Sequence, residues 1–184
     1  MEIKIPFYQV LNILLTGLVL ASGTIISFPG PLQSFLHNSK SFWTHSEVIT
    51  TMAFIAISYE IGLIVNRLGS IVLEPAMVRL RLIPFNKNYK LYNDLKQRYP
   101  ILEILSREYA SSRTCVMLFT MLSAMHVIYG RRSFGLCFFL LAILFAFSWR
   151  KHAGKIVTLM ITDQTKQEEL HNQSKKGNND GIRN

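Results

Sequence analysis

Four long apolar runs that carry almost no charge constrain this chain more than any other feature of its sequence. They cover residues 5–28, 48–73, 114–129 and 134–149, and most of the Lys, Arg, Asp and Glu residues lie between or after them. About 20 apolar residues in a helix span a bilayer, and a charge at the bilayer centre costs roughly 2.5–3.5 kcal/mol on insertion scales. The pattern predicts an all-α integral membrane protein with about four transmembrane helices in two hairpins, forming one membrane domain over residues 1–170.

Three of these spans have alternative interpretations. Ala21-Ser22-Gly23 in the first run is similar to a signal-peptidase site. The apolar run continues past that site, however, and few basic residues precede it, so we expect a retained anchor. The third and fourth runs are short for a span, and a re-entrant or interfacial hairpin is the alternative there. We expect Trp149-Arg150-Lys151 to anchor the end of the fourth run.

The remaining segments are polar and often basic. We expect residues 76–109 to form an amphipathic cytoplasmic connector, residues 153–170 an amphipathic helix, and residues 171–184 a disordered tail. Basic side chains of the connector are candidates for contacts with lipid head groups or with a cytosolic protein partner. These candidates are Arg79, Arg81, Lys87, Lys90, Lys96 and Arg98.

The distribution of positive charge predicts the orientation. Nine Lys and Arg residues lie from Arg67 to Arg113 and seven from Arg150 onward, whereas the segment after the first run holds only Lys40. Because Lys and Arg are enriched on the cytoplasmic side, we expect both termini in the cytoplasm, in a bacterial inner membrane. The net charge of +9 is then explained by anionic head groups, and no nucleic-acid-binding motif accompanies it.

Glu60 is the acidic residue that lies well inside an apolar run, and Arg67 follows it two helical turns later. The two side chains project from nearly the same face, about 10 Å apart along the helix. They are too far apart to pair within one helix, so they would pair between copies or across a pore, with Asn66 nearby. The alternative is a monomer in which Glu60 bonds to Asn12 or to a hydroxyl group on a neighbouring span.

Small residues accompany these charges in the second run. Ser58 and Gly62 make a small-xxx-small pair, and Gly69 follows one heptad after Gly62. Such residues allow helix backbones to approach closely. The pattern therefore predicts a helix–helix interface, and the polar residues beside it make a homo-oligomer our first expectation.

No enzyme signature occurs in the sequence. There is no GxSxG, HExxH, P-loop or GxGxxG pattern. Cys115 and Cys137 lie in apolar runs without ligand-like spacing, and His126 has no carboxylate in the third or fourth run to complete a metal set. We therefore expect no catalytic, cofactor-binding or metal-binding residues.

Three strings of residues resemble those of a group of small bacterial polytopic membrane proteins. The strings are Pro6-Phe7-Tyr8, Tyr59-Glu60-Ile61-Gly62 with Asn66-Arg67-Leu68-Gly69-Ser70, and Ser106-Arg107-Glu108-Tyr109. Some proteins of this group accompany antiviral systems, including CRISPR loci, as pore-forming effectors or accessories. The resemblance covers about residues 5–150 and implies a role in prokaryotic antiviral defence. No Arg-x4–6-His pair is present, which disfavours the accessories that carry a nuclease-like domain.

These observations lead to three hypotheses for function. The first is a self-associating membrane protein that alters membrane permeability or anchors a cytosolic partner. The second is an ion or proton channel or carrier subunit that uses Glu60 as its buried acid. The third, a membrane-embedded enzyme, would require polar groups converging around Glu60, Asn66 and Arg67.

Overall fold

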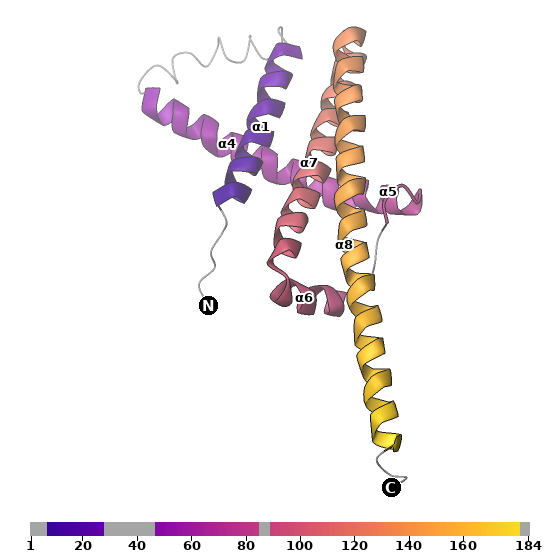
Figure 1. Cartoon of the computed structure of the whole chain (residues 1–184). Coiled ribbons are helices and arrows are strands. Elements are labelled where there is room, and N and C mark those ends of the chain that lie inside the picture. The colour runs from indigo at the N-terminus through magenta and orange to yellow at the C-terminus, as the bar shows by residue number, and fades with distance from the viewer. Residues whose placement is uncertain (1–6, 28–46, 85–88, 181–184) are drawn as a thin grey trace.

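The computed structural model describes residues 7–27, 47–84 and 89–180, and every regular element in these ranges is a helix (Figure 1). The predicted all-α fold is therefore confirmed. Four helical segments are long and apolar enough to cross a membrane, which is the predicted number. The elements are α1 (Phe7–Ser27), α4 (Glu47–Leu68), the π-helix η1 (Gly69–Leu73), α5 (Glu74–Arg79), α6 (Tyr89–Arg98), α7 (Pro100–Ile128) and α8 (Arg132–Asp180).

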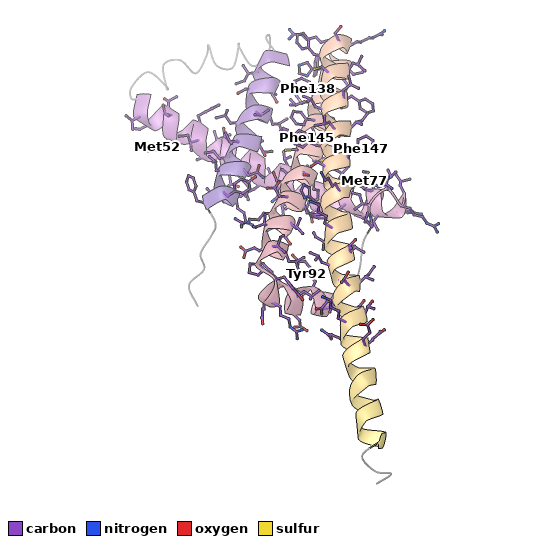
Figure 2. All side chains as sticks on the ribbon, viewed as in Figure 1. Met52, Met77, Tyr92, Phe138, Phe145 and Phe147 are labelled. Carbon is purple, nitrogen blue, oxygen red and sulfur yellow. The ribbon has the colours of Figure 1, made fainter. Side chains whose placement is uncertain are left out.

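Helices α7 and α8 form a long hairpin (Figure 1). Gly130 makes the turn with a positive φ of 75°, a conformation that glycine adopts without steric cost. Below the turn, the ring of Phe119 stacks on Phe138 and Phe145 of α8, with centroid distances of 6.2 and 5.5 Å. Phe147 lies on the other side of α8 (Figure 2) and is 67% exposed.

Helix α4 runs obliquely across α1, α7 and α8 instead of alongside them (Figure 1). It continues through η1 into α5, so the candidate span extends from Val48 to Arg79. At the crossing with α1, the two backbones are in contact because Gly17 and Gly62 lack side chains. A Cβ atom on Gly62 would lie only 1.9 Å from the backbone oxygen of Ile13.

Three clusters of buried apolar side chains hold the helices together. The first joins α1, α4 and α7 through Leu20, Val65, Leu118 and Leu122. The second surrounds Trp149 and also contains Ile83, Val116 and Ala153. The third fixes α6 against α7 and α8 and consists of Leu95, Leu102 and Met160.

Trp149, which was expected to help anchor the end of the fourth run, does not lie on the protein surface. Its side chain is fully buried in the second cluster, where its ring makes an edge-to-face contact with Tyr109 at a centroid distance of 5.7 Å. An aromatic residue between an apolar run and a basic pair is typical of a membrane interface. Trp149 has this sequence context but is not at the surface, because α5 and the segment that follows it cover that side of α8.

The boundaries of the last two spans also differ from the expectation. Helix α7 begins at Pro100 and is 29 residues long, so residues 100–109 belong to this helix and not to a separate connector. Helix α8 is 49 residues long and continues through the predicted amphipathic helix and into the predicted tail. Proline is absent from α8, and the single glycine between its apolar and polar parts, Gly154, disfavours the helix by only about 1 kcal/mol.

Large apolar side chains cover much of the described surface. Met52 on α4 (Figure 2), Ile71 on η1 and Phe134 on α8 are at least 60% exposed. Contiguous exposed apolar surface of this extent is unusual in soluble monomers. Together with the four long apolar helices, it suggests a multi-pass membrane protein.

Candidate functional site

The most connected polar group of the described residues surrounds Arg113, near the middle of α7. Its guanidinium forms a salt bridge with Glu74, and both side chains are largely buried. It also donates to Ser70 Oγ at 3.3 Å and to Asn66 Oδ1 at 3.4 Å. Glu74 in turn accepts a hydrogen bond of 2.8 Å from the hydroxyl group of Tyr109. The charge of Arg113 is therefore compensated within the chain.

The π-helix η1 explains how these three partners reach one arginine. Asn66, Ser70 and Glu74 are spaced by four residues, and in a continuous α-helix that spacing drifts around the axis because one turn holds 3.6 residues. The wider turn of η1, Gly69–Leu73, absorbs part of this drift. All three side chains consequently contact Arg113 on α7.

A cavity of about 150 Å³ adjoins this group between α1, α4 and α7. Asn66 belongs to the group around Arg113 and also to the lining of the cavity. Its Oδ1 accepts a second hydrogen bond, of 3.0 Å, from Thr114, which is another lining residue. On the opposite wall, Ser111 donates to Asn12 Oδ1 at 3.4 Å. We call this cavity the polar pocket, and its polar lining includes Gln9, Asn12, Asn66, Arg107, Ser111 and Thr114.

Glu60 and Arg67, which the sequence singled out, lie outside the polar pocket. Both side chains are exposed on the face of α4 that points away from α1 and α7. The ion pair found among the described residues joins Arg113 to Glu74 instead, and no hydrogen bond links Glu60 to Asn12 or to another described side chain. The polar convergence expected around Glu60, Asn66 and Arg67 is thus divided between two faces of α4.

The small residues of the second run contact two different helices. Ser58 and Gly62 pack against α1, where a Cβ atom on Gly17 would lie 1.6 Å from the Ser58 backbone oxygen. Gly69 packs against Arg113 and Met117 of α7 at ordinary van der Waals distances. These residues therefore form helix interfaces within a single chain.

The basic connector residues are spread along the chain and do not form one cluster. Arg79 and Arg81 lie at the end of α5 and just after it, and Lys96 and Arg98 lie on α6; all four are exposed. Lys90 belongs to α6, whereas Lys87 lies outside the described residues. No described acidic side chain forms a salt bridge with the four exposed ones, so they remain available to an anionic surface.

His126 and the cysteines have separate environments. The ring of His126 is buried, is bonded through Nδ1 to the carbonyl of Leu122 at 2.9 Å, and packs against Phe138 at a centroid distance of 5.0 Å. Cys137 is exposed on α8, and Cys115 is half-buried on α7. Within the described ranges, no group of three or more potential ligands is arranged to hold a metal ion.

Several residues of this region were not identified from the sequence. Glu74 marked only the end of the second run, and Tyr109 was assigned to the connector, because α7 was expected to begin after Arg113. The four-residue spacing of Asn66, Ser70 and Glu74 is the signal that would have indicated a shared partner. No family model matches the chain, and no curated protein or solved structure is detectably similar to it.

Proposed function

We propose that this chain is a self-associating multi-pass membrane protein that serves as an anchor for a cytosolic partner. Two copies would meet through the exposed face of α4. The observation that supports this proposal is a regular line of exposed residues on that face, which we call the outer stripe. It consists of Ile57, Glu60, Ile64, Arg67 and Ile71.

The outer stripe has the spacing of a helix–helix contact surface. Its members alternate three and four residues apart, which is the spacing at which apolar residues form the seam between packed helices. Ile57, Ile64 and Ile71 are 53%, 58% and 71% exposed, so the rest of the chain leaves them uncovered. A helix of this kind buries the stripe when a second helix packs against it.

The two charges in the outer stripe make lipid an unfavourable neighbour. Glu60 and Arg67 lie on either side of the midpoint of the apolar segment from Val48 to Arg79. An ionised side chain that faces lipid costs up to about 2.5–3.5 kcal/mol at the bilayer centre on insertion scales, and less toward the head groups. A partner that neutralises both charges removes this cost.

A second copy of the chain supplies the matching charges. A two-fold axis beside Ile64 would exchange the positions of Glu60 and Arg67, so that each Glu60 lies opposite the Arg67 of the other copy. Isologous contacts of this type are self-complementary and generate closed dimers. One dimer would then contain two Glu60–Arg67 ion pairs.

Because α4 is inclined to α7 and α8, two copies can pair in this way while both keep the same orientation in the membrane. If α4 ran parallel to α7 and α8, antiparallel pairing would require the two copies to be inverted relative to one another. Because α4 runs across them (Figure 1), a two-fold axis parallel to α8 brings two α4 helices together in opposite directions. Both copies keep their basic segments on the same side, as the positive-inside rule requires.

The anchoring role is supported by the polar end of α8, which extends beyond the other helices (Figure 1). The hydrogen bond of 3.3 Å from Tyr99 to Asp163 is the furthest one along α8 that ties a described side chain to another element. The following side chains from Lys166 to Glu169 are exposed. Since α8 is continuous with an apolar span, this end projects as a helical arm on which a cytosolic protein would dock.

Cysteine cross-linking in membranes tests the dimer. Ile64→Cys, in a background with Cys115→Ser and Cys137→Ser, would lie beside the two-fold axis, and mild oxidation should join two copies. Leu144→Cys on α8 is the matched control, because Leu144 is also exposed, at 61%, but lies away from the outer stripe. Equal cross-linking at the two positions would contradict the proposal.

Charge reversal then tests the pairing itself. Either single variant, Glu60→Arg or Arg67→Glu, replaces both proposed ion pairs of the dimer by two residues of the same charge. Cross-linking of the Ile64→Cys chain should therefore fall. The double variant restores opposite charges and should restore cross-linking. If the double variant remains as impaired as the single variants, Glu60 and Arg67 do not pair between copies.

A permeability function is the second candidate, because Glu60 and Arg67 share one exposed face. More than two copies that turned this face inward would line a polar path with both charges. Ion and dye efflux from liposomes distinguishes the two functions. Efflux that Glu60→Gln alters would support a conduit, whereas tight liposomes containing cross-linked dimers would support the anchor.

A further inference from the structure

The polar pocket between α1, α4 and α7 lies on the opposite side of α4 from the outer stripe, and dimerisation does not require it. Its volume of about 150 Å³ is well above the roughly 10–15 Å³ that a single water needs. The chemistry of the lining indicates which ligand fits.

Arg107 provides an uncompensated positive charge at the wall of the pocket. Its Nε atom is buried and has no hydrogen-bond partner among the described residues. Glu103, one helical turn earlier, does not compensate it, because the ion pair found among the described residues joins Arg113 to Glu74. A guanidinium can only donate hydrogen bonds, so the group that satisfies Arg107 must be an acceptor.

The carboxamide of Asn66 adds a second donor. Arg113 has no acceptor atoms, so the atom of Asn66 that it contacts must be the oxygen. The hydroxyl group of Thr114 donates to the same oxygen. The Nδ2 group of Asn66 is therefore left to donate elsewhere, and Asn66 lines the pocket.

The lining is also free of negative charge. Among the described residues that form the pocket, none is Asp or Glu, and the remaining polar members are Gln9, Asn12, Ser111, Thr114 and Tyr8. Arg with several neutral donors and no carboxylate is the composition that binds phosphate groups. An amine or a metal cation would meet an uncompensated arginine instead.

The position of the pocket along the helices indicates the source of the phosphate. Gln9 lies in the first turn of α1, and Arg107 lies two turns after the start of α7 at Pro100. By the charge distribution, these ends face the cytoplasm, so the pocket lies near the depth of phospholipid head groups. Basic pockets between helices at this level bind lipid phosphates.

We propose that the polar pocket is a binding site for a phosphate group, with Arg107 as its principal ligand. The phosphate would belong to the head group of an anionic lipid of the cytoplasmic leaflet or to a soluble phosphate. In either case, Arg107 supplies charge-assisted hydrogen bonds, and Asn66 and Gln9 orient the oxygen atoms.

The test uses the full chain purified in a maltoside detergent, which contains no phosphate. Thermal unfolding is measured after adding short-chain phosphatidic acid, the matching diacylglycerol or inorganic phosphate. Phosphatidic acid should raise the unfolding temperature, whereas diacylglycerol, which has the same tails and no phosphate, should not. A shift produced equally by inorganic phosphate would identify a soluble phosphate as sufficient.

Two variants locate the effect. Arg107→Gln should weaken phosphate binding about tenfold or more, the loss expected for a charge-assisted hydrogen bond. Arg132→Gln, which removes an exposed arginine at the start of α8 that does not line the pocket, should not. Gln9→Ala is a second pocket variant in case Arg107→Gln does not fold, and it should weaken binding to a smaller extent. Equal shifts with phosphatidic acid and diacylglycerol, or unchanged binding by folded Arg107→Gln, would overturn the proposal.

Discussion

Gly17 of α1 lies so close to Ser58 of α4 that a Cβ atom on Gly17 would be 1.6 Å from the backbone oxygen of Ser58. Gly62, one helical turn after Ser58, meets the backbone of Ile13 in the same way. Without a hydrophobic driving force between helices in lipid, close packing of this kind is a main source of stability. The crossing of α1 and α4 therefore depends on these two glycines.

We expect Gly17→Ala and Gly62→Ala each to destabilise the protein by about 1–3 kcal/mol or more, the cost of overpacking. The clash is with backbone, which cannot move aside as a flexible side chain would. Unfolding by denaturing detergent, followed by circular dichroism, measures the loss. Gly154→Ala is the matched control, because a Cβ atom there meets nothing within 4 Å, and alanine favours helix by about 1 kcal/mol.

Gly69 allows a finer comparison within the same helix. A Cβ atom at this position would lie 3.6 Å from its nearest neighbours, the side chain and backbone of Arg113 and the side chain of Met117. That distance is an ordinary contact, so Gly69→Ala should change stability far less than Gly62→Ala. Equal losses at the two positions would show that α4 does not cross α1 as closely as described.

The ion pair between Arg113 and Glu74 leads to a second prediction. Glu74→Gln leaves a largely buried arginine without its carboxylate, and breaking such a pair by removing one partner costs about 3–5 kcal/mol when the pair is fully buried. With 13% and 18% of the two side chains exposed, we expect a loss at the lower end of this range. Tyr109→Phe removes one hydrogen bond to the same carboxylate and should cost about 1.5–3 kcal/mol.

A double-variant cycle isolates the contribution of the pair. Combining Glu74→Gln with Arg113→Met removes both charges, so the double variant should be less destabilised than the sum of the two single variants. Contacting residues typically show interaction energies of about 0.5–3 kcal/mol. Strict additivity would mean that the pair contributes nothing to stability.

The sequence was sufficient to predict the helices but not which of their faces meet. Apolar run length follows from the thickness of the bilayer, so the number and type of the long helices followed from composition alone. The partners of Asn66 and Glu74 depend on Arg113, which lies about 40 residues later in the chain and was expected to precede its helix. Periodicity within one helix contains no information on how a neighbouring helix crosses it.

Glu60 and the small residues show the same limit. The sequence identified Glu60, Ser58 and Gly62 as unusual in an apolar run, and all three lie on described helix surfaces with distinct surroundings. It did not indicate that Ser58 and Gly62 face α1 while Glu60 faces outward. The helical repeat places Glu60 on the opposite face of α4 from Ser58 and Gly62, but which of the two faces meets α1 is set by contacts between both helices.

A third prediction contrasts two aromatic residues that are two positions apart on α8. Trp149 is fully buried, whereas Phe147 is 67% exposed. Trp149→Ala should cost about 3–5 kcal/mol because it leaves a cavity among Ile83, Val116 and Tyr109. Phe147→Ala should change the free energy of unfolding by less than about 1 kcal/mol in the same detergent assay, since no cavity forms. The opposite order would mean that α8 is rotated about its axis.

The final prediction concerns the projecting end of α8. Truncation after Glu169 should leave the unfolding temperature of the membrane body and the cross-linking of the Ile64→Cys chain unchanged. Among the described side chains, Asp163 makes the furthest hydrogen bond from α8 to another element, to Tyr99, and the three apolar clusters end at Met160. An isolated polar helix of this length is only marginally stable without packing partners, so its loss removes little folding energy. Thermal unfolding and oxidation of Ile64→Cys in membranes measure both properties on the same sample. A truncated chain that unfolds early would show that this end packs on the body, and the arm would then be part of the fold and not a site offered to a partner.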